Sequence, residues 1–161
     1  MESLAKSSMK TYMKCLVSGG QTGADRAALD WAIKNNFRYS GWCPHGRLAE
    51  DGPIIEKYEL NETRTSKYEE RTRYNVQDSD GTVIFSLTAE LTGGTLLTKY
   101  FARKTNKPLL HLESGQPNLG CRLKDFVWNN KINSLNVAGP RASEEHNIYQ
   151  FVFKVLDVAF G

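Results

Sequence analysis

One run of residues restricts the fold more than any other, because three large apolar side chains follow one another without a polar interruption. Val83, Ile84 and Phe85 lie within residues 81–87 (GTVIFSL). Continuous rather than alternating apolar residues are typical of a strand buried on both faces, as in a parallel sheet covered by helices. Further strands of this sheet are predicted at residues 14–18, 39–42, 108–112 and 134–138.

Segments with helical periodicity alternate with these runs. The first, residues 24–35, places its apolar residues on one face. Thr22 and Asp25 are predicted to form a capping box before it, and Glu144 and Glu145 to lie at the positive end of the last helix. The other helices are predicted at residues 66–77, 95–104, 119–130 and 143–160. This alternation indicates a doubly wound α/β fold, with helices on both faces of a mostly parallel sheet.

The length of 161 residues is that of one domain. We expect a single domain over residues 14–161, preceded by a flexible N-terminal tail over residues 1–13. Residues 43–53 (CPHGRLAEDGP) are rich in glycine, proline and charge, and they are predicted to form an irregular loop.

Composition excludes several classes of protein. The net charge of +3 suits a small anionic ligand, but it is too low for a dedicated nucleic-acid binder, so we expect no nucleic-acid partner. No window has about 18 consecutive apolar residues, so we expect no membrane span. The three cysteines are widely spaced and form no disulfide framework or metal motif, which favours a reducing cytoplasm. We also allow for a homo-oligomer.

Two glycine-rich loops each join a predicted strand to a predicted helix. The first is GGQTGAD, residues 19–25, and the second is LTGGT, residues 91–95. Glycines let backbone N–H groups at a helix N-terminus approach an anion closely. Neither loop has the Walker A or the GxGxxG pattern. Because parallel strands end at one edge of the sheet, the two loops are predicted to form one anion-binding crevice at a topological switch point.

At these motifs the sequence resembles the family of proposed molybdenum carriers. The matching segments are SGGQTGADRAALDWA, GWCPHGRLAEDG, YELNETRTSKYEERTRYNVQDSDGTVIF and LTGGTLLT. That family is a branch of the Rossmann-like superfamily that includes the lysine-decarboxylase-like (LOG) phosphoribohydrolases. The resemblance implies a Rossmann-like fold and a ligand that is a nucleotide or a molybdopterin-type cofactor. It implies binding by the two loops: Gly19, Gly20, Gln21, Thr22, Gly23, Asp25, Arg26, Gly93, Gly94 and Thr95.

The sequence departs from the phosphoribohydrolases at one position that matters for catalysis. Those enzymes carry the motif PGGxGTxxE, whose glutamate takes part in cleaving the N-glycosidic bond, whereas Thr98 stands at that position here. A hydroxyl cannot replace a carboxylate base. We therefore expect a carrier of the molybdenum cofactor or of a nucleotide, with a nucleotide-processing hydrolase as the alternative. Catalysis would then need a carboxylate from another loop: Glu50, Asp51, Asp78 or Asp80.

The loop after residues 39–42 supplies further candidates. Trp42 could stack on a heterocycle and Arg47 could pair with a phosphate, or both could be structural. Cys43 and His45 do not have zinc-ligand spacing with the third cysteine, and we expect no metal site. Arg71 and Asn75 share a helix face that could brace the crevice. The alternating charges of residues 68–73 (YEERTR) favour a salt-bridged surface.

Overall fold

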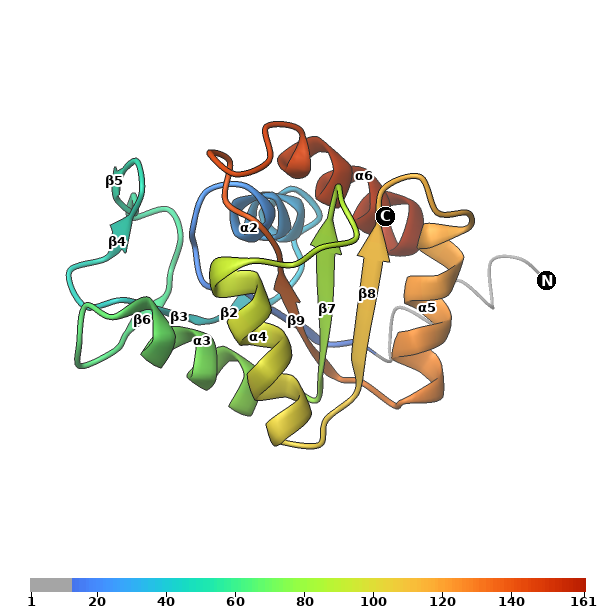
Figure 1. Ribbon diagram of the computed structural model, residues 1–161, viewed down its shortest axis with the longest axis horizontal. Coiled ribbons are helices and arrows are strands. Elements are labelled where there is room, and N and C mark those ends of the chain that lie inside the picture. Colours follow the sequence, from blue (N-terminus) through green and yellow to red (C-terminus); the bar gives the residue numbers. More distant parts are fainter. Residues whose placement is uncertain (1–12) are drawn as a thin grey trace.

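The structure is a computed structural model that describes residues 13–161. Its centre is a five-stranded, wholly parallel sheet in the order β2-β1-β9-β7-β8 (Figure 1). The strands are β1 (Cys15–Val17), β2 (Tyr39–Ser40), β7 (Gly81–Ser86), β8 (Leu109–Glu113) and β9 (Ser134–Ala138). Every residue of β7 is buried, as the uninterrupted apolar run predicts. The predicted α/β fold is therefore confirmed.

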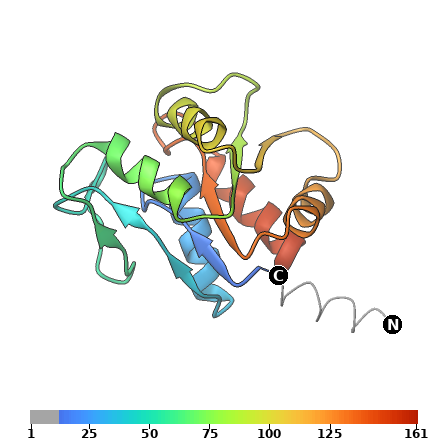
Figure 2. The same ribbon diagram turned by 90° about the horizontal axis from the view of Figure 1, so that it is seen from below.

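Helices cover both faces of the sheet (Figures 1 and 2). On one face α6 (Ile148–Phe160) packs against α2 (Ala24–Lys34) and α5 (Leu119–Asn129). On the other face α3 (Tyr68–Gln77) packs against α4 (Gly93–Lys104). The main core lies between the sheet and the first group of helices, where Trp31 and Phe85 are fully buried. The chain therefore leaves β1 toward one face and β7 toward the other.

Residues 41–66 form an excursion from the sheet that the sequence predicted only in part. The predicted strand at residues 39–42 is divided at Gly41, whose absent side chain leaves room for the Ser18 carbonyl oxygen. Beyond Gly41 the chain pairs β3 (Trp42–Cys43) with β6 (Asn61–Glu62) in parallel. The segment predicted as an irregular loop contains an antiparallel hairpin instead, formed by β4 (Leu48–Ala49) and β5 (Gly52–Pro53).

One predicted helix cap and one predicted helix start are wrong. Gly23 is the N-cap of α2, with φ of 79° and no side-chain cap, so the capping box of Thr22 and Asp25 does not form. Helix α6 begins at Ile148 rather than at residue 143. Glu144 and Glu145 therefore precede its first turn. The Glu145 carboxylate instead accepts a hydrogen bond of 2.6 Å from the Leu87 N–H. That bond ties the loop before α6 to the end of β7.

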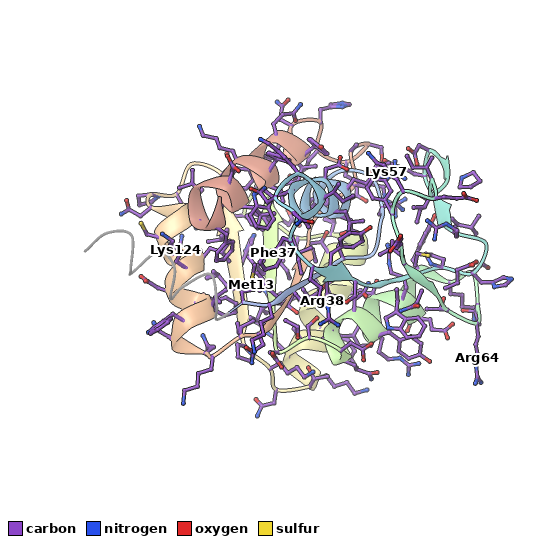
Figure 3. The ribbon with its side chains drawn as sticks, turned by 180° about the vertical axis from the view of Figure 1, so that it is seen from behind. Met13, Phe37, Arg38, Lys57, Arg64 and Lys124 are labelled. Carbon is purple, nitrogen blue, oxygen red and sulfur yellow. The ribbon has the colours of Figure 1, made fainter. Side chains whose placement is uncertain are left out.

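The predicted tail lies outside the described residues except for Met13. That side chain is only 2% exposed and belongs to the main core (Figure 3). Met13 therefore packs with the residues of the predicted domain. In the part of the chain that the structure describes, no helix is long and apolar enough to cross a membrane.

Candidate functional site

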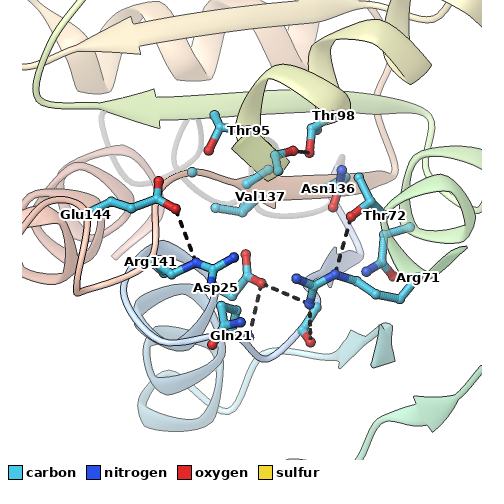
Figure 4. A pocket seen from close by; sticks show the side chains of 15 residues that line it. Gln21, Asp25, Arg71, Thr72, Thr95, Thr98, Asn136, Val137, Arg141 and Glu144 are labelled. Atoms are coloured by element: carbon cyan, nitrogen blue, oxygen red, sulfur yellow. Dashed lines mark hydrogen bonds and ion pairs between the residues drawn. The ribbon is translucent and has the colours of Figure 1, made fainter. Parts of the chain in front are cut away.

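A pocket lies where β1, β9 and β7 end, between the start of α4 and the side of α3 (Figure 4). The chain turns from β1 to one face of the sheet and from β7 to the other, so this edge is the topological switch point at which α/β folds bind ligands. The pocket encloses about 50 Å³. Its lining residues are Gly19, Gln21, Asp25, Arg71, Thr72, Asn75, Gly94, Thr95, Thr98, Asn136, Val137, Ala138, Gly139, Arg141 and Glu144.

The start of α4 presents free backbone donors to this pocket. No described residue accepts a hydrogen bond from the N–H of Gly94 or Thr95, and α4 has no side-chain cap. A Cβ added to Gly94 would meet no atom within 4 Å. Thr98 Oγ1 donates to the Gly94 carbonyl at 3.0 Å, so its hydroxyl proton is already used. The second glycine loop is therefore an open helix N-terminus of the kind that binds anions.

The first glycine loop differs, because protein atoms already occupy the space beside it. A Cβ on Gly23 would lie 2.6 Å from the Pro140 carbonyl oxygen, and one on Gly20 would lie 2.7 Å from Leu60. The N–H of Ala24 donates to Pro140 at 3.2 Å. Gly20 and Gly23 thus serve close packing of the chain against itself. The start of α4 is the more open helix N-terminus at this pocket, because the N–H groups of Ala24 and Arg26 at the start of α2 already donate to backbone carbonyls.

A buried ion pair joins α2 to α3 below the pocket. Arg71 Nη1 lies 3.6 Å from Asp25 Oδ2 and donates to the Gly19 carbonyl at 3.0 Å. The same Asp25 oxygen accepts the Gln21 N–H at 3.1 Å. Both charged side chains are only 11% exposed. A Cβ on Gly19 would lie 2.5 Å from Arg71 Nη1, so this glycine makes room for the guanidinium.

The Asp25 carboxyl also faces the pocket directly. No described residue donates a hydrogen bond to its second oxygen, which points toward the middle of the pocket in Figure 4. Burial raises the pKa of Asp25, while Arg71 and the Gln21 hydrogen bond oppose the rise. Asp25 therefore offers the pocket a carboxyl group that holds its proton to higher pH than an exposed aspartate does.

A second arginine enters from the loop that follows β9. Arg141 Nε lies 3.2 Å from Glu144 Oε1, and these side chains are 31% and 36% exposed. The guanidinium carbons of Arg141 and Arg71 lie 5.5 Å and 5.3 Å from the centre of the Tyr68 ring. Two cations thus reach the pocket from opposite sides, each supported by the same aromatic ring.

Gln21 contributes an unusual donor to the pocket wall. Its Oε1 accepts hydrogen bonds from the backbone N–H groups of Thr22 at 3.1 Å and Glu50 at 2.9 Å. These bonds fix the orientation of the amide. Its Nε2 is buried and has no hydrogen-bond partner among the described residues. A buried donor without an acceptor costs stability, and this one lies beside the candidate anion site.

The pocket brings together only part of the set predicted from sequence. Five predicted residues line it: Gly19, Gln21, Asp25, Gly94 and Thr95. Seven do not line it: Gly20, Thr22, Gly23, Arg26, Trp42, Arg47 and Gly93. The last of these, Gly93, is the first residue of α4 and has φ of 53°.

Three of these outlying side chains are committed to other contacts. Trp42 Nε1 donates to Asp78 at 2.7 Å. Arg47 donates to the backbone carbonyls of Ile54, Ile55 and Tyr58 and so holds the excursion together. Arg26 pairs with the carboxylate of Asp51.

The four carboxylates considered as catalytic candidates also lie outside the pocket lining. Glu50 accepts hydrogen bonds from Thr22 and Ser143, which lower its pKa although burial opposes them. Asp80 accepts the N–H groups of residues 133 and 134, at the opposite edge of the sheet. The acidic groups that do line the pocket are Asp25 and Glu144.

Several lining residues were missed or assigned differently from sequence. Arg71 and Asn75 both line the pocket, on the helix face considered as a brace of the crevice. The other interpretation of Arg71, within a salt-bridged surface, is wrong because this side chain is buried. Arg141 and Glu144 were missed because they follow a strand without any motif. Asn136 could have been found, since it is a polar residue inside the apolar run of residues 134–138. No group of three His, Cys, Asp or Glu residues within 13–161 could hold a metal ion.

The chain matches the circularly permutated YpsA SLOG family over residues 16–160. It is similar to the crystal structure of a proposed molybdenum carrier protein from Syntrophus aciditrophicus. The two are 44% identical, the match covers 93% of this chain and 96% of that one, and the TM-score is 0.90. No curated protein matches the chain. The chain therefore belongs to the circularly permutated YpsA SLOG family.

Proposed function

We propose that the chain binds a phosphate-bearing heterocycle, either a nucleotide or the molybdenum cofactor, with the phosphate at the start of α4. The observation that carries this proposal is the open space at Gly94, beside free N–H groups and between two arginines. Anions bind at helix N-termini because backbone donors and the helix dipole act together. The unpartnered Nε2 of Gln21 supports a ligand that carries an additional acceptor.

The similar protein from Syntrophus aciditrophicus is described as a proposed molybdenum carrier, and the molybdenum cofactor is the ligand that we propose on that basis. The lining residues include two arginines and no cysteine or histidine. They fit the phosphate and polar ring atoms of such a cofactor, whose metal would lie outside this set of side chains. Arg71, Arg141 and the N–H groups of Gly94 and Thr95 would hold the phosphate. The cofactor would supply the redox chemistry in an acceptor enzyme.

Carriage or sensing of the ligand is favoured over its turnover. Thr98 stands where the phosphoribohydrolases have their glutamate, and its hydroxyl is bonded to the Gly94 carbonyl. The test is mass spectrometry of the small molecule that copurifies with the protein, followed by incubation of that molecule with fresh protein. We expect a phosphorylated heterocycle that raises the melting temperature and stays chemically intact. A copurifying molecule without an anionic group would contradict the proposal.

A hydrolase is the second candidate, and Asp25 is the observation that favours it. A buried carboxyl group with a raised pKa that faces a pocket is a candidate general acid or base. Chromatography of a nucleotide incubated with the protein tests this function. Free base and sugar phosphate beyond one equivalent per chain, lost in Asp25→Asn and retained in Glu50→Gln, would establish hydrolysis and overturn the carrier proposal.

We further propose a cytoplasmic, self-associating protein. Cys15, Cys43 and Cys121 are all unpaired in the described residues, which suits a reducing compartment. Leu96 and Tyr100 are about half exposed and lie one turn apart on α4, so they offer an apolar contact for a homo-oligomer. Light scattering of the wild-type protein and of Tyr100→Glu tests the association.

A further inference from the structure

A second hollow lies next to the pocket, and two residues form the wall between them. This hollow has a volume of about 240 Å³. Thr95 and Glu144 line both spaces. The remaining lining residues of the second hollow are Thr88, Glu90, Leu91, Thr92, Pro140 and Glu145. A ligand that extends out of the pocket past Glu144 would therefore lie in this hollow.

The two spaces differ in charge. The pocket has two arginines that balance the carboxyl groups of Asp25 and Glu144, together with the free N–H groups of α4. The second hollow has three carboxylates, from Glu90, Glu144 and Glu145, together with threonine hydroxyls, and no lysine or arginine. Carboxylates accept hydrogen bonds and repel anions. The pocket is therefore suited to one anionic group, and the second hollow to a neutral group with N–H or O–H donors.

Glu144 lines both spaces and is fixed at their border by its contacts. Its carboxylate is held by Arg141 at 3.2 Å, and it lies near the start of α4, because a Cβ on Gly93 would be 3.8 Å from Glu144 Oε1. In this position Glu144 neutralises one of the two cations and places a negative charge beside the free N–H groups. A phosphate at this site would compete with it for Arg141.

Volume supports a ligand that uses both spaces. The pocket alone has room for little more than a phosphate-sized group, since one water molecule takes about 30 Å³ in the liquid. Together the two spaces approach the lower end of the range of small-molecule sites, about 300 Å³. Glu144 is partly exposed, so its side chain can rotate without disturbing the core.

We infer that the ligand is a monophosphate ester whose single phosphate binds in the arginine-lined pocket and whose neutral, donor-rich part lies in the acidic hollow, with Glu144 as the gate between them. This inference rests on the proposed function. It adds the number of phosphate groups on the ligand, the polarity of the rest of the ligand, and its direction from the pocket into the second hollow. A polyphosphate would place further negative charge against Glu90 and Glu145.

The test is calorimetric titration with four probes: inorganic phosphate, guanosine, guanosine 5′-monophosphate and guanosine 5′-triphosphate. The monophosphate carries one phosphate and a base with N–H donors, and we expect it to bind at least about tenfold more tightly than each other probe. If inorganic phosphate binds and the triphosphate binds as tightly as the monophosphate, the inference is overturned while the proposed function stands. If none of the four probes binds, both are overturned.

Two substitutions examine the acidic groups separately. Glu144→Gln should tighten monophosphate binding about fivefold, because Arg141 is released and a repulsion is removed. Glu90→Gln should reduce the difference in affinity between the monophosphate and the triphosphate. Asp125→Asn is the control, since it changes the net charge equally from an exposed position on α5. Equal effects of all three substitutions would mean that net charge alone acts, and would refute the gate.

Discussion

Gly94→Val is the substitution that separates ligand binding from folding most clearly. The side chain would project into open space, because no atom lies within 4 Å of a Cβ at this position. Gly94 lies in the first turn of α4, where valine loses little relative to glycine. We expect the free energy of unfolding of the ligand-free protein to change by less than about 0.5 kcal/mol.

The same side chain would fill much of a pocket that encloses about 50 Å³. A ligand at a hundredfold excess over its Kd stabilises the folded state by about 2.7 kcal/mol. In a protein of this size that corresponds to an increase in melting temperature of roughly 5–10 °C. Gly94→Val should abolish this increase, because valine carbons would occupy the position of the phosphate and cover the Gly94 and Thr95 N–H groups.

The assay is thermal unfolding followed by circular dichroism, with and without the copurified ligand or guanosine 5′-monophosphate. Gly94→Ala is the graded control, since one methyl group should weaken the ligand-dependent increase without removing it. Two results would refute the reasoning. In the first, Gly94→Val keeps the full ligand-dependent increase in melting temperature. In the second, the ligand-free variant melts lower than the ligand-free wild type by as many degrees as the ligand-dependent increase loses.

Arg71→Met should lower the free energy of unfolding by about 3 kcal/mol at pH 7, because it leaves the Asp25 carboxylate buried without its cation. At pH 4, where the Asp25 carboxyl is more protonated, the loss should be smaller. Urea unfolding at the two pH values measures both. Burial raises the folded-state pKa of Asp25 above its unfolded value, so its proton favours folding at low pH and this contribution disappears as the pH rises through the folded pKa. Asp25→Asn should therefore reduce the pH dependence of the free energy of unfolding in this range, and an unchanged pH dependence would contradict the raised pKa of Asp25. Gly41→Ala should cost about 3 kcal/mol or more, because a Cβ would overlap the Ser18 carbonyl oxygen; near-normal urea unfolding would contradict this. Glu50→Gln should leave ligand affinity in calorimetry unchanged, since Glu50 does not line the pocket.

The order of the elements could be predicted because each main strand is a continuous apolar run. Val83, Ile84 and Phe85 are fully buried, and β9 covers residues 134–138, the range predicted from sequence. The excursion over residues 41–66 could not be predicted in the same way. Its strands are two residues long, and Arg47 supports it by donating to backbone carbonyls. Such bonds leave no periodic pattern in a sequence.

The glycines of the candidate site and Asp25 were named from the sequence, and Arg71 was considered as a brace of the crevice, but the ion pair between Asp25 and Arg71 was not predicted. Gly94 and Gly19 do line the pocket, because loops that follow parallel strands end at one edge. Arg71 lies 52 residues along the chain from Gly19, to whose carbonyl it donates, and its ion-pair partner Asp25 lies in the first turn of α2. A pair so distant in sequence becomes visible only when the fold places α3 beside the β1–α2 loop.

The amide of Gln21 joins the pocket to the excursion, and this link makes hydrogen exchange a reporter of ligand binding. Its Oε1 holds the N–H groups of Thr22 and Glu50, while its Nε2 has no partner among the described residues. A ligand acceptor that engages Nε2 would restrain the whole amide and slow the opening of both bonds. The Glu50 amide proton, in the turn between β4 and β5, should then exchange with solvent more slowly in the complex.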